Sequence, residues 1–176
     1  CEAAQMALNV APGAGGRPFG FQRLKNFNLD LWRDLLDAAQ EHELPAAEAQ
    51  IWGSDISPVA VRAALANLDR ADLLPAVTLA TGDLLELEAP APSGVMIANL
   101  PYGERLSEAD ELAAFYPQLG AALKRNFAGW TCYLLTADKR LPKLMRLTPS
   151  RKIPLYNGAL ECRLYEFRMV AGSNRP

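Results

Sequence analysis

Four consecutive residues, Asn99-Leu100-Pro101-Tyr102, carry the groups needed to hold an exocyclic amine of a nucleic-acid base. Such an amine is a poor nucleophile because its lone pair is delocalised into the ring. The side-chain oxygen of Asn99 and the main-chain carbonyl of Leu100 can accept its two N–H groups and so free that lone pair. Pro101 stiffens the turn without adding an N–H, and Tyr102 offers an aromatic face to the base. An electrophilic methyl group aligned with the amine then needs no strong base.

Two carboxylates complete the set of candidate site residues. Asp55 follows an apolar segment and can accept hydrogen bonds from two ribose hydroxyls, or it can simply fill a turn and cap a helix. Asp83 follows Gly82 and can accept the amino group of an adenine, although Gly-Asp is also an ordinary turn pair. The tetrapeptide also has a purely structural interpretation, a strand-to-loop turn in which Pro101 sets the bend and Tyr102 packs against neighbouring residues.

The elements that must position these residues alternate along the chain. Hydrophobic periodicity and capping residues predict the following segments. Helices are expected over 28–43, 57–68, 108–126 and 142–147, strands over 50–54, 76–80, 94–98 and 129–136, and a hairpin from 151–156 and 160–170 through Asn157-Gly158. We expect the apolar side of the first helix to be buried, and the strand over 94–98 to be covered on both faces. The residues expected on that buried side are Leu29, Leu31, Trp32, Leu35, Leu36 and Ala39.

This alternation predicts an α/β sheet with helices on both faces and an antiparallel hairpin at its end. In such sheets ligands bind beyond the carboxyl ends of the strands. Asp55, Asp83 and Asn99 each follow a predicted strand, so we expect their side chains to face one crevice.

Composition limits the classes of protein that fit. The 176 residues, half of them apolar, suit one domain over 1–176, and the absence of a run of eighteen apolar residues argues against a membrane span. Three widely spaced cysteines and a single histidine argue against a metal site, and they fit reduced, buried thiols in a cytoplasmic protein. The first residues lack the features of a signal peptide and begin within a helical pattern, from which we expect an N-terminal truncation.

Charge is distributed unevenly along the chain. Residues 1–120 contain seven Lys or Arg and seventeen Asp or Glu, a net charge of −10, whereas residues 121–176 contain eleven and three, a net charge of +8. The second segment can therefore form a basic face for phosphates. The alternative is that these are ordinary solvated side chains that folding scatters.

The run Asn-Leu-Pro-Tyr-Gly-Glu-Arg over 99–105 resembles the signature of the THUMP-associated RNA methyltransferases, in particular the RlmL-type branch that methylates guanine N2 of 23S ribosomal RNA. Further likenesses extend over nearly the whole chain. Glu2-Ala3-Ala4 resembles the helix after the family's cofactor loop, and Phe19-Gly20-Phe21 with Trp32 resembles the insertion that follows. Gly53-Ser54-Asp55 resembles the ribose-binding motif, and residues 157–162 resemble the closing hairpin.

The resemblance implies a Rossmann-like class I methyltransferase sheet that binds S-adenosylmethionine, with large-subunit ribosomal RNA as its partner and neither a metal nor a membrane. By that resemblance Asp55 binds the ribose, Ile56 packs on the adenine, and Asp83 with Leu84 holds the adenine amine. Asn99 borders the cofactor as well as the base. The catalytic set is Asn99, Leu100, Pro101 and Tyr102. Glu104 and Arg105 shape the loop behind it and receive no chemical role.

Two departures from the family pattern bear on these expectations. The family commonly has Pro where Leu100 stands, which leaves guanine and adenine open as the target base. The family's first strand and glycine-rich loop would precede Cys1, and no THUMP domain occurs in the 176 residues. We therefore expect this chain to bind S-adenosylmethionine weakly or not at all.

Three other functions stay open at this point. DNA and RNA adenine amino-methyltransferases share the tetrapeptide, and a non-catalytic RNA-binding module could retain the fold. A nicotinamide-dependent oxidoreductase fits Asp55, but the chain has no Gly-x-Gly-x-x-Gly loop. The sequence leaves the oligomeric state open.

Overall fold

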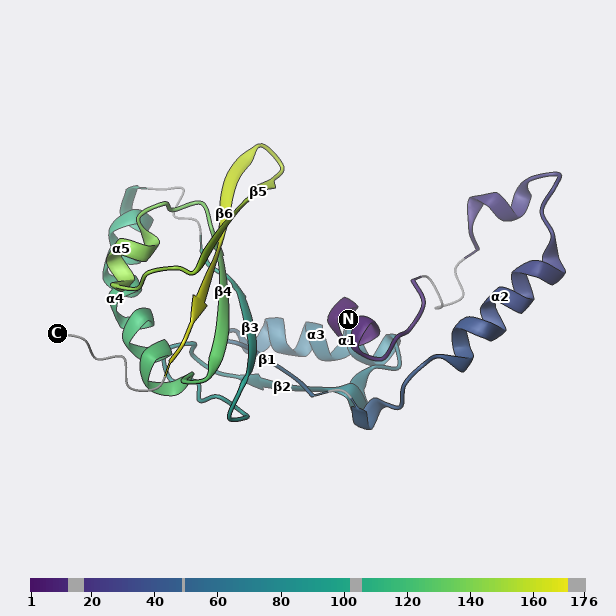
Figure 1. Cartoon of the computed structure of the whole chain (residues 1–176), viewed down its shortest axis with the longest axis horizontal. Helices are drawn as coiled ribbons and strands as arrows, with labels where there is room; N and C mark the ends of the chain where they lie inside the picture. The colour runs from purple at the N-terminus through teal and green to yellow at the C-terminus, as the bar shows by residue number, and fades with distance from the viewer. Residues whose placement is uncertain (13–17, 49, 102–105, 171–176) are drawn as a thin grey trace. The chain divides into compact units, whose positions relative to one another are not determined.

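The computed structural model describes residues 1–12, 18–48, 50–101 and 106–170, with the side chains of 48 and 106–111 excepted. The chain forms two compact units, Cys1–Gly82 and Asp83–Pro176, and each is treated by itself below. Figure 1 traces both units along the chain.

The first unit is built on two parallel strands, β1 (Ile51–Asp55) and β2 (Val77–Thr81), with Asp55 opposite Thr81. Helix α3 (Pro58–Arg70) connects them, and α1 (Glu2–Ala7) precedes them in the chain. Short 3-10 turns lie at Gly20–Arg23, Ala46–Glu48 and Leu74–Ala76. Most of the buried residues described in this unit form one cluster, made of Ala4, Leu8, Leu68, Leu73 and Ala76.

Helix α2 (Leu29–Glu41) begins where the sequence predicted, because the Asn28 side chain accepts hydrogen bonds from the N–H groups of Asp30 and Leu31. The prediction that its apolar side is buried was wrong, since no residue of α2 is buried. Leu31 and Leu35 are each more than half exposed. What α2 does contact is a group of aromatic rings, in which Phe19 and Phe21 meet Trp32 edge-on and Phe21 also meets Phe27.

The second unit holds a mixed sheet in the order β3-β4-β6-β5. Its strands are β3 (Gly94–Asn99), β4 (Trp130–Thr136), β5 (Arg151–Asn157) and β6 (Leu160–Arg168). Strands β3 and β4 run parallel, while β6 is antiparallel to both of its neighbours. Helices α4 (Leu106–Asn126) and α5 (Leu141–Met145) complete this unit.

The core of the second unit lies between α4, α5 and one face of the sheet. Its fully buried members include Tyr116 and Leu119 of α4, Leu141 of α5, Leu134 of β4 and Phe167 of β6. The opposite face of β3 carries Val95 and Ile97, which are 62% and 75% exposed. The prediction that this strand is covered on both faces was therefore wrong, because one side of β3 is partly buried and the other is exposed.

The hairpin β5–β6 closes through Gly158 and Ala159, and Asn157 is the last residue of β5, opposite Leu160. Gly158 has φ of 60°, a conformation that glycine adopts without steric cost at the first central position of a tight hairpin turn. The predicted hairpin is confirmed, with its turn one residue later than expected.

The three cysteines are free, as expected, but only Cys132 and Cys162 are buried. Cys1 is exposed because it precedes the first turn of α1. None of the helices in the described ranges combines the length and the apolar character that crossing a bilayer requires.

Candidate active site

Asp55 is the last residue of β1 and is exposed. One of its carboxylate oxygens accepts the N–H of Ser57 at 2.8 Å, and its main-chain carbonyl accepts the N–H of Gly82 at 3.0 Å. Ser57 in turn caps α3, with its hydroxyl oxygen 3.3 Å from the N–H of Ala60. Asp55 thus shapes the turn, as the plain alternative held, while its second carboxylate oxygen bonds to nothing in the described part of the chain.

Ile56 stands between Asp55 and the capped start of α3, and its side chain is 70% exposed. An apolar side chain this exposed, directly after a strand end, offers a flat surface to a ligand ring. Pro58 at the first helical position fixes the direction in which the chain leaves this point.

Asp83 opens the second unit and is partly buried. One of its carboxylate oxygens accepts the N–H of Leu85 at 2.9 Å, and its carbonyl accepts those of Glu86 and Leu87. The residue therefore closes a compact turn. Leu84, next to it, packs against the core of the second unit and anchors this turn.

Asn99 is the last residue of β3 and is exposed, whereas Leu100 is buried in the core of the same unit. The N–H of Leu100 donates to the carbonyl of Leu135 at 3.0 Å, so the pairing of β3 with β4 continues one residue past the strand. Pro101 is exposed again. The buried Leu100 side chain thus fixes the turn between two exposed residues, and Leu84 packs against the same core.

Tyr102, Glu104 and Arg105 lie outside the described residues, so the stacking role of Tyr102 stays a prediction. The convergence of Asp55 with Asp83 and Asn99 also stays a prediction, because Asp55 belongs to the first unit and the other two residues to the second. The chain does run from Gly82, whose N–H donates to Asp55, directly into Asp83.

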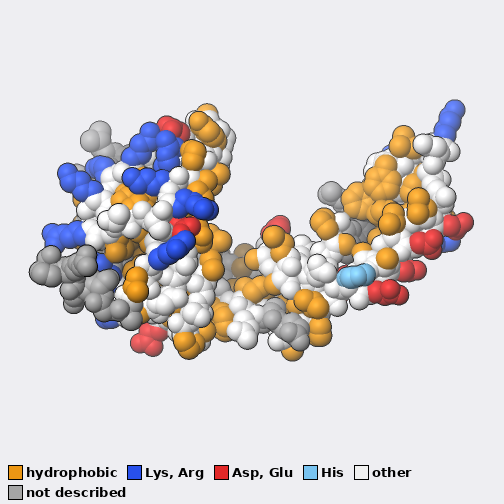
Figure 2. All heavy atoms as spheres, in the orientation of Figure 1, with side chains coloured by type: hydrophobic (Ala, Val, Ile, Leu, Met, Phe, Trp, Pro, Cys, Tyr) orange, Lys and Arg blue, Asp and Glu red, His pale blue; other side chains and the backbone are white. Residues whose placement is uncertain are grey.

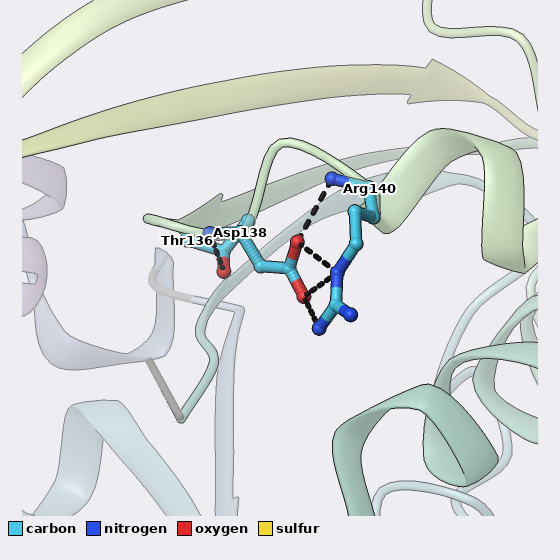
Figure 3. Close-up of polar contacts among 3 residues, drawn as sticks. All are labelled: Thr136, Asp138 and Arg140. Atoms are coloured by element: carbon cyan, nitrogen blue, oxygen red, sulfur yellow. Dashed lines mark hydrogen bonds and ion pairs between the residues drawn. The ribbon is translucent and has the colours of Figure 1, made fainter. Parts of the chain in front are cut away.

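Sequence reasoning missed a polar group after β4. The Thr136 hydroxyl oxygen accepts the N–H of Asp138 at 3.1 Å, and Asp138 binds Arg140 through the main-chain N–H at 2.8 Å and the guanidinium Nη2 at 2.9 Å, as Figure 3 shows. Because β3 and β4 are parallel, this group leaves the same edge of the sheet as Asn99. The group could have been predicted from the sequence in the same way as Asp55, Asp83 and Asn99, because polar residues follow directly after a buried strand here as well.

Electrostatics keep Asp138 ionised. The hydrogen bond from the Arg140 side chain holds the pKa of Asp138 below its ordinary value, and burial of the carboxyl opposes that shift without reversing it. The pair therefore holds an oriented guanidinium at the sheet edge where β3 and β4 end. Within the described ranges no three His, Cys, Asp or Glu side chains come together as a metal site would require.

Comparison with known proteins adds independent information. Residues 1–166 match the sequence model of a family described as RMKL-like, methyltransferase domain. Ribosomal RNA large subunit methyltransferase K/L of Shewanella frigidimarina is 33% identical over 177 residues, covering 99% of this chain and 25% of that protein.

Two solved structures share the fold closely. SMU.472, crystallised with S-adenosylhomocysteine, has a TM-score of 0.88 and 28% identity over 96% of this chain and 44% of its own. A Listeria monocytogenes protein named as a predicted N6-adenine-specific DNA methylase has a TM-score of 0.83 and 26% identity, over 96% and 43% of the two chains. The chain thus spans about a quarter of the length of the Shewanella protein and less than half of the length of the two solved structures.

Proposed function

The chain belongs to the family of RMKL-like methyltransferase domains, and from that premise we propose that it transfers a methyl group from S-adenosylmethionine to an exocyclic amine of an RNA base, guanine N2 of large-subunit ribosomal RNA. The Rossmann-like fold that the sequence predicted agrees with that of SMU.472. In this proposal residues 1–176 act as one catalytic domain of a cytoplasmic protein.

The observation that carries the proposal is the alternation of exposure at the end of β3. Asn99 and Pro101 are exposed on either side of the buried Leu100, whose N–H is bonded to Leu135. An amide oxygen held at a fixed strand end can accept one N–H of an amine, and the Leu100 carbonyl can accept the other. Anchoring of Leu100 in the core limits the movement of both acceptors, and such positioning is the main requirement of this reaction.

The residues present fit the adenosyl part of the cofactor. Asp55 keeps one carboxylate oxygen without a hydrogen bond to described residues, which suits a ribose hydroxyl, and the exposed Ile56 side chain suits one face of the adenine. Asp83, anchored through Leu84, would accept the adenine amine. When bound, the cofactor supplies an electrophilic methyl group. The protein groups then orient the amine and cofactor and need no proton transfer before the methyl group moves.

A second target base is supported by one comparison. The Listeria monocytogenes protein of similar fold is named for adenine N6. Leu100, which stands where the family usually has Pro, also leaves adenine open as the target base. An amine on adenine offers the same two N–H groups to Asn99 and Leu100, so the same geometry serves either base.

The test is methylation of ribosomal RNA from cells that lack this modification, using the complete protein, labelled cofactor and nucleoside analysis of the product. We expect N2-methylguanosine, and loss of about 100-fold or more in kcat for Asn99→Ala, because one of the two amine acceptors is removed. Asn67→Ala on the exposed side of α3 is the matched control and should keep full activity.

Each result has a distinct meaning. Methylation unchanged in Asn99→Ala would refute the role of Asn99. N6-methyladenosine as the product would replace guanine by adenine, and a product only on DNA would overturn the RNA assignment.

A further inference from the structure

The tip of the β5–β6 hairpin carries an aromatic side chain that faces solvent. Tyr156 is 73% exposed, more than any other aromatic residue in the described ranges. It is the second-last residue of β5, two positions before the turn at Gly158. A ring this exposed gains little stabilisation from burial, so packing in the core does not account for an aromatic residue at this position.

Cationic side chains share the face of the hairpin on which Tyr156 lies. Because side chains alternate along a strand, Lys152 and Tyr156 point to the same side of β5. The residues of β6 directly opposite positions 154 and 156 are Arg163 and Glu161, which belong to that same face. Lys152 is exposed and forms no ion pair with any described residue.

Glu161 reduces this positive charge only in part. Its carboxylate binds two cations, Lys139 at 3.0 Å and Arg163 on its own strand. The hydrogen bond from Arg163, followed by that from Lys139, keeps the pKa of Glu161 low, so the carboxylate stays ionised. The group of three carries a net charge of +1, and its hydrogen bonds hold both cations beside Tyr156.

The charge extends beyond the hairpin. Residues 137–168 contain eight Lys or Arg and three Asp or Glu, a net charge of +5. Figure 2 shows Lys and Arg side chains gathered over the region of α5, β5 and β6. Of the two alternatives that the sequence left open for its basic segment, this gathering favours a basic face.

We infer that the solvent-exposed part of this hairpin face binds unpaired RNA, with the Tyr156 ring stacked on a base and Lys152, Lys139 and Arg163 close to phosphates. Aromatic rings set among cations are the means by which proteins bind single-stranded nucleic acid, since every base has a face for stacking and every linkage has a charge. The inference deepens the proposed function and rests on its assignment of an RNA substrate.

The test is fluorescence anisotropy of a short labelled single-stranded RNA of mixed sequence, titrated without cofactor with the complete protein and its variants. We expect Tyr156→Ala to weaken binding about 5- to 100-fold, and Tyr156→Phe to restore it, because stacking needs the ring and not the hydroxyl. Leu155→Ala is the matched control, as Leu155 is exposed on the opposite side of the same strand. Lys152→Gln should lower the slope of log affinity against log salt by about one.

The outcomes separate this inference from the proposed function. RNA binding that is unchanged in Tyr156→Ala, with methyl transfer intact, overturns the hairpin site and leaves the proposed function standing. Asn99→Ala should lower methyl transfer about 100-fold or more without weakening the RNA complex. If the unaltered protein binds no single-stranded RNA, the hairpin site fails, while methylation of ribosomal RNA still decides the proposed function. A loss of self-association in Tyr156→Ala, with RNA affinity unchanged, would assign the tip to a protein contact instead.

Discussion

At the scale of single residues, the environment of a side chain decides its chemistry more than its type does. Cys132 and Cys162 are fully buried on central strands, whereas Cys1 is exposed. Burial raises the pKa of the Cys132 thiol to about 12, because the thiolate would lose its hydration. The sequence alone shows three equivalent cysteines.

Thiol labelling should distinguish them. At pH 8 we expect one thiol per folded chain, that of Cys1, to react rapidly with a disulfide reagent, and three to react after denaturation, since only the thiolate attacks. Cys1→Ser should remove the fast reaction. Fast labelling of two or more thiols in the native protein would contradict the burial seen on β4 and β6.

Asp138 is one of the residues whose titration should affect stability. Its pKa is lowered in the folded state, so its stabilising effect is fully present above the ordinary aspartate pKa of about 4 and is lost as the pH falls through the folded value. We expect Asp138→Asn to lower the free energy of unfolding by about 1–2 kcal/mol at pH 7, from the loss of the charged hydrogen bonds to Arg140.

Urea unfolding at pH 7 and at pH 3 measures this effect. The difference between Asp138→Asn and the unaltered chain should shrink at the lower pH, while the exposed control Asp69→Asn should differ little at either. A difference that stays constant or grows towards low pH would show that the Arg140 pair is not its source.

At the scale of elements, the close approach of α4 to α5 depends on one missing side chain. A Cβ atom at Gly120 would lie 2.4 Å from the carbonyl oxygen of Met145, which is backbone and cannot rotate away. Gly120 therefore lets the end of α5 approach α4. The prediction of both helices from periodicity contained no information about this contact.

We expect Gly120→Ala to destabilise the protein by about 1–3 kcal/mol, although alanine is the better helix former, because the clash outweighs its helix propensity. Gly20→Ala is the control, since an added Cβ there would have no neighbour within 4 Å. Thermal unfolding of the two variants measures the difference. Equal melting temperatures would mean that α5 is displaced at little cost.

At the scale of the whole molecule, the sheet is divided. Among the described residues, β1 pairs with β2 in one sheet, and β3 lies at the edge of the other. An edge strand offers unpaired main-chain groups and, in β3, the exposed side chains of Val95 and Ile97.

The affinity of this chain for S-adenosylmethionine should depend on which parts of the cofactor its residues can hold. In the proposal, Asp55, Ile56 and Asp83 hold the ribose and adenine, whereas none of the 176 residues is assigned to the methionine part of the cofactor. We therefore expect calorimetry on this chain to give a Kd for S-adenosylmethionine weaker than about 1 mM. Micromolar binding that Asp55→Ala abolishes would show that the groups present suffice.

Local patterns in the sequence determined much of this protein. Periodicity located the helices and strands to within about two residues, since it is set by neighbours along the chain. Asn28 and Ser57 marked helix starts because a cap bonds to the backbone two or three residues away. The order of strands and the tetrapeptide at 99–102 led to the correct fold and family.

Tertiary structure alone decided which apolar faces are buried and which charges meet. Leu31 of α2 and Ile97 of β3 have the pattern of buried residues, yet they are exposed because no described element of their own unit covers them. The contact of Lys139 with Glu161 joins positions 22 apart, and the turn after β3 is fixed by Leu135 of β4. Burial and ion pairing depend on partners distant in the chain, which hydrophobic periodicity does not identify.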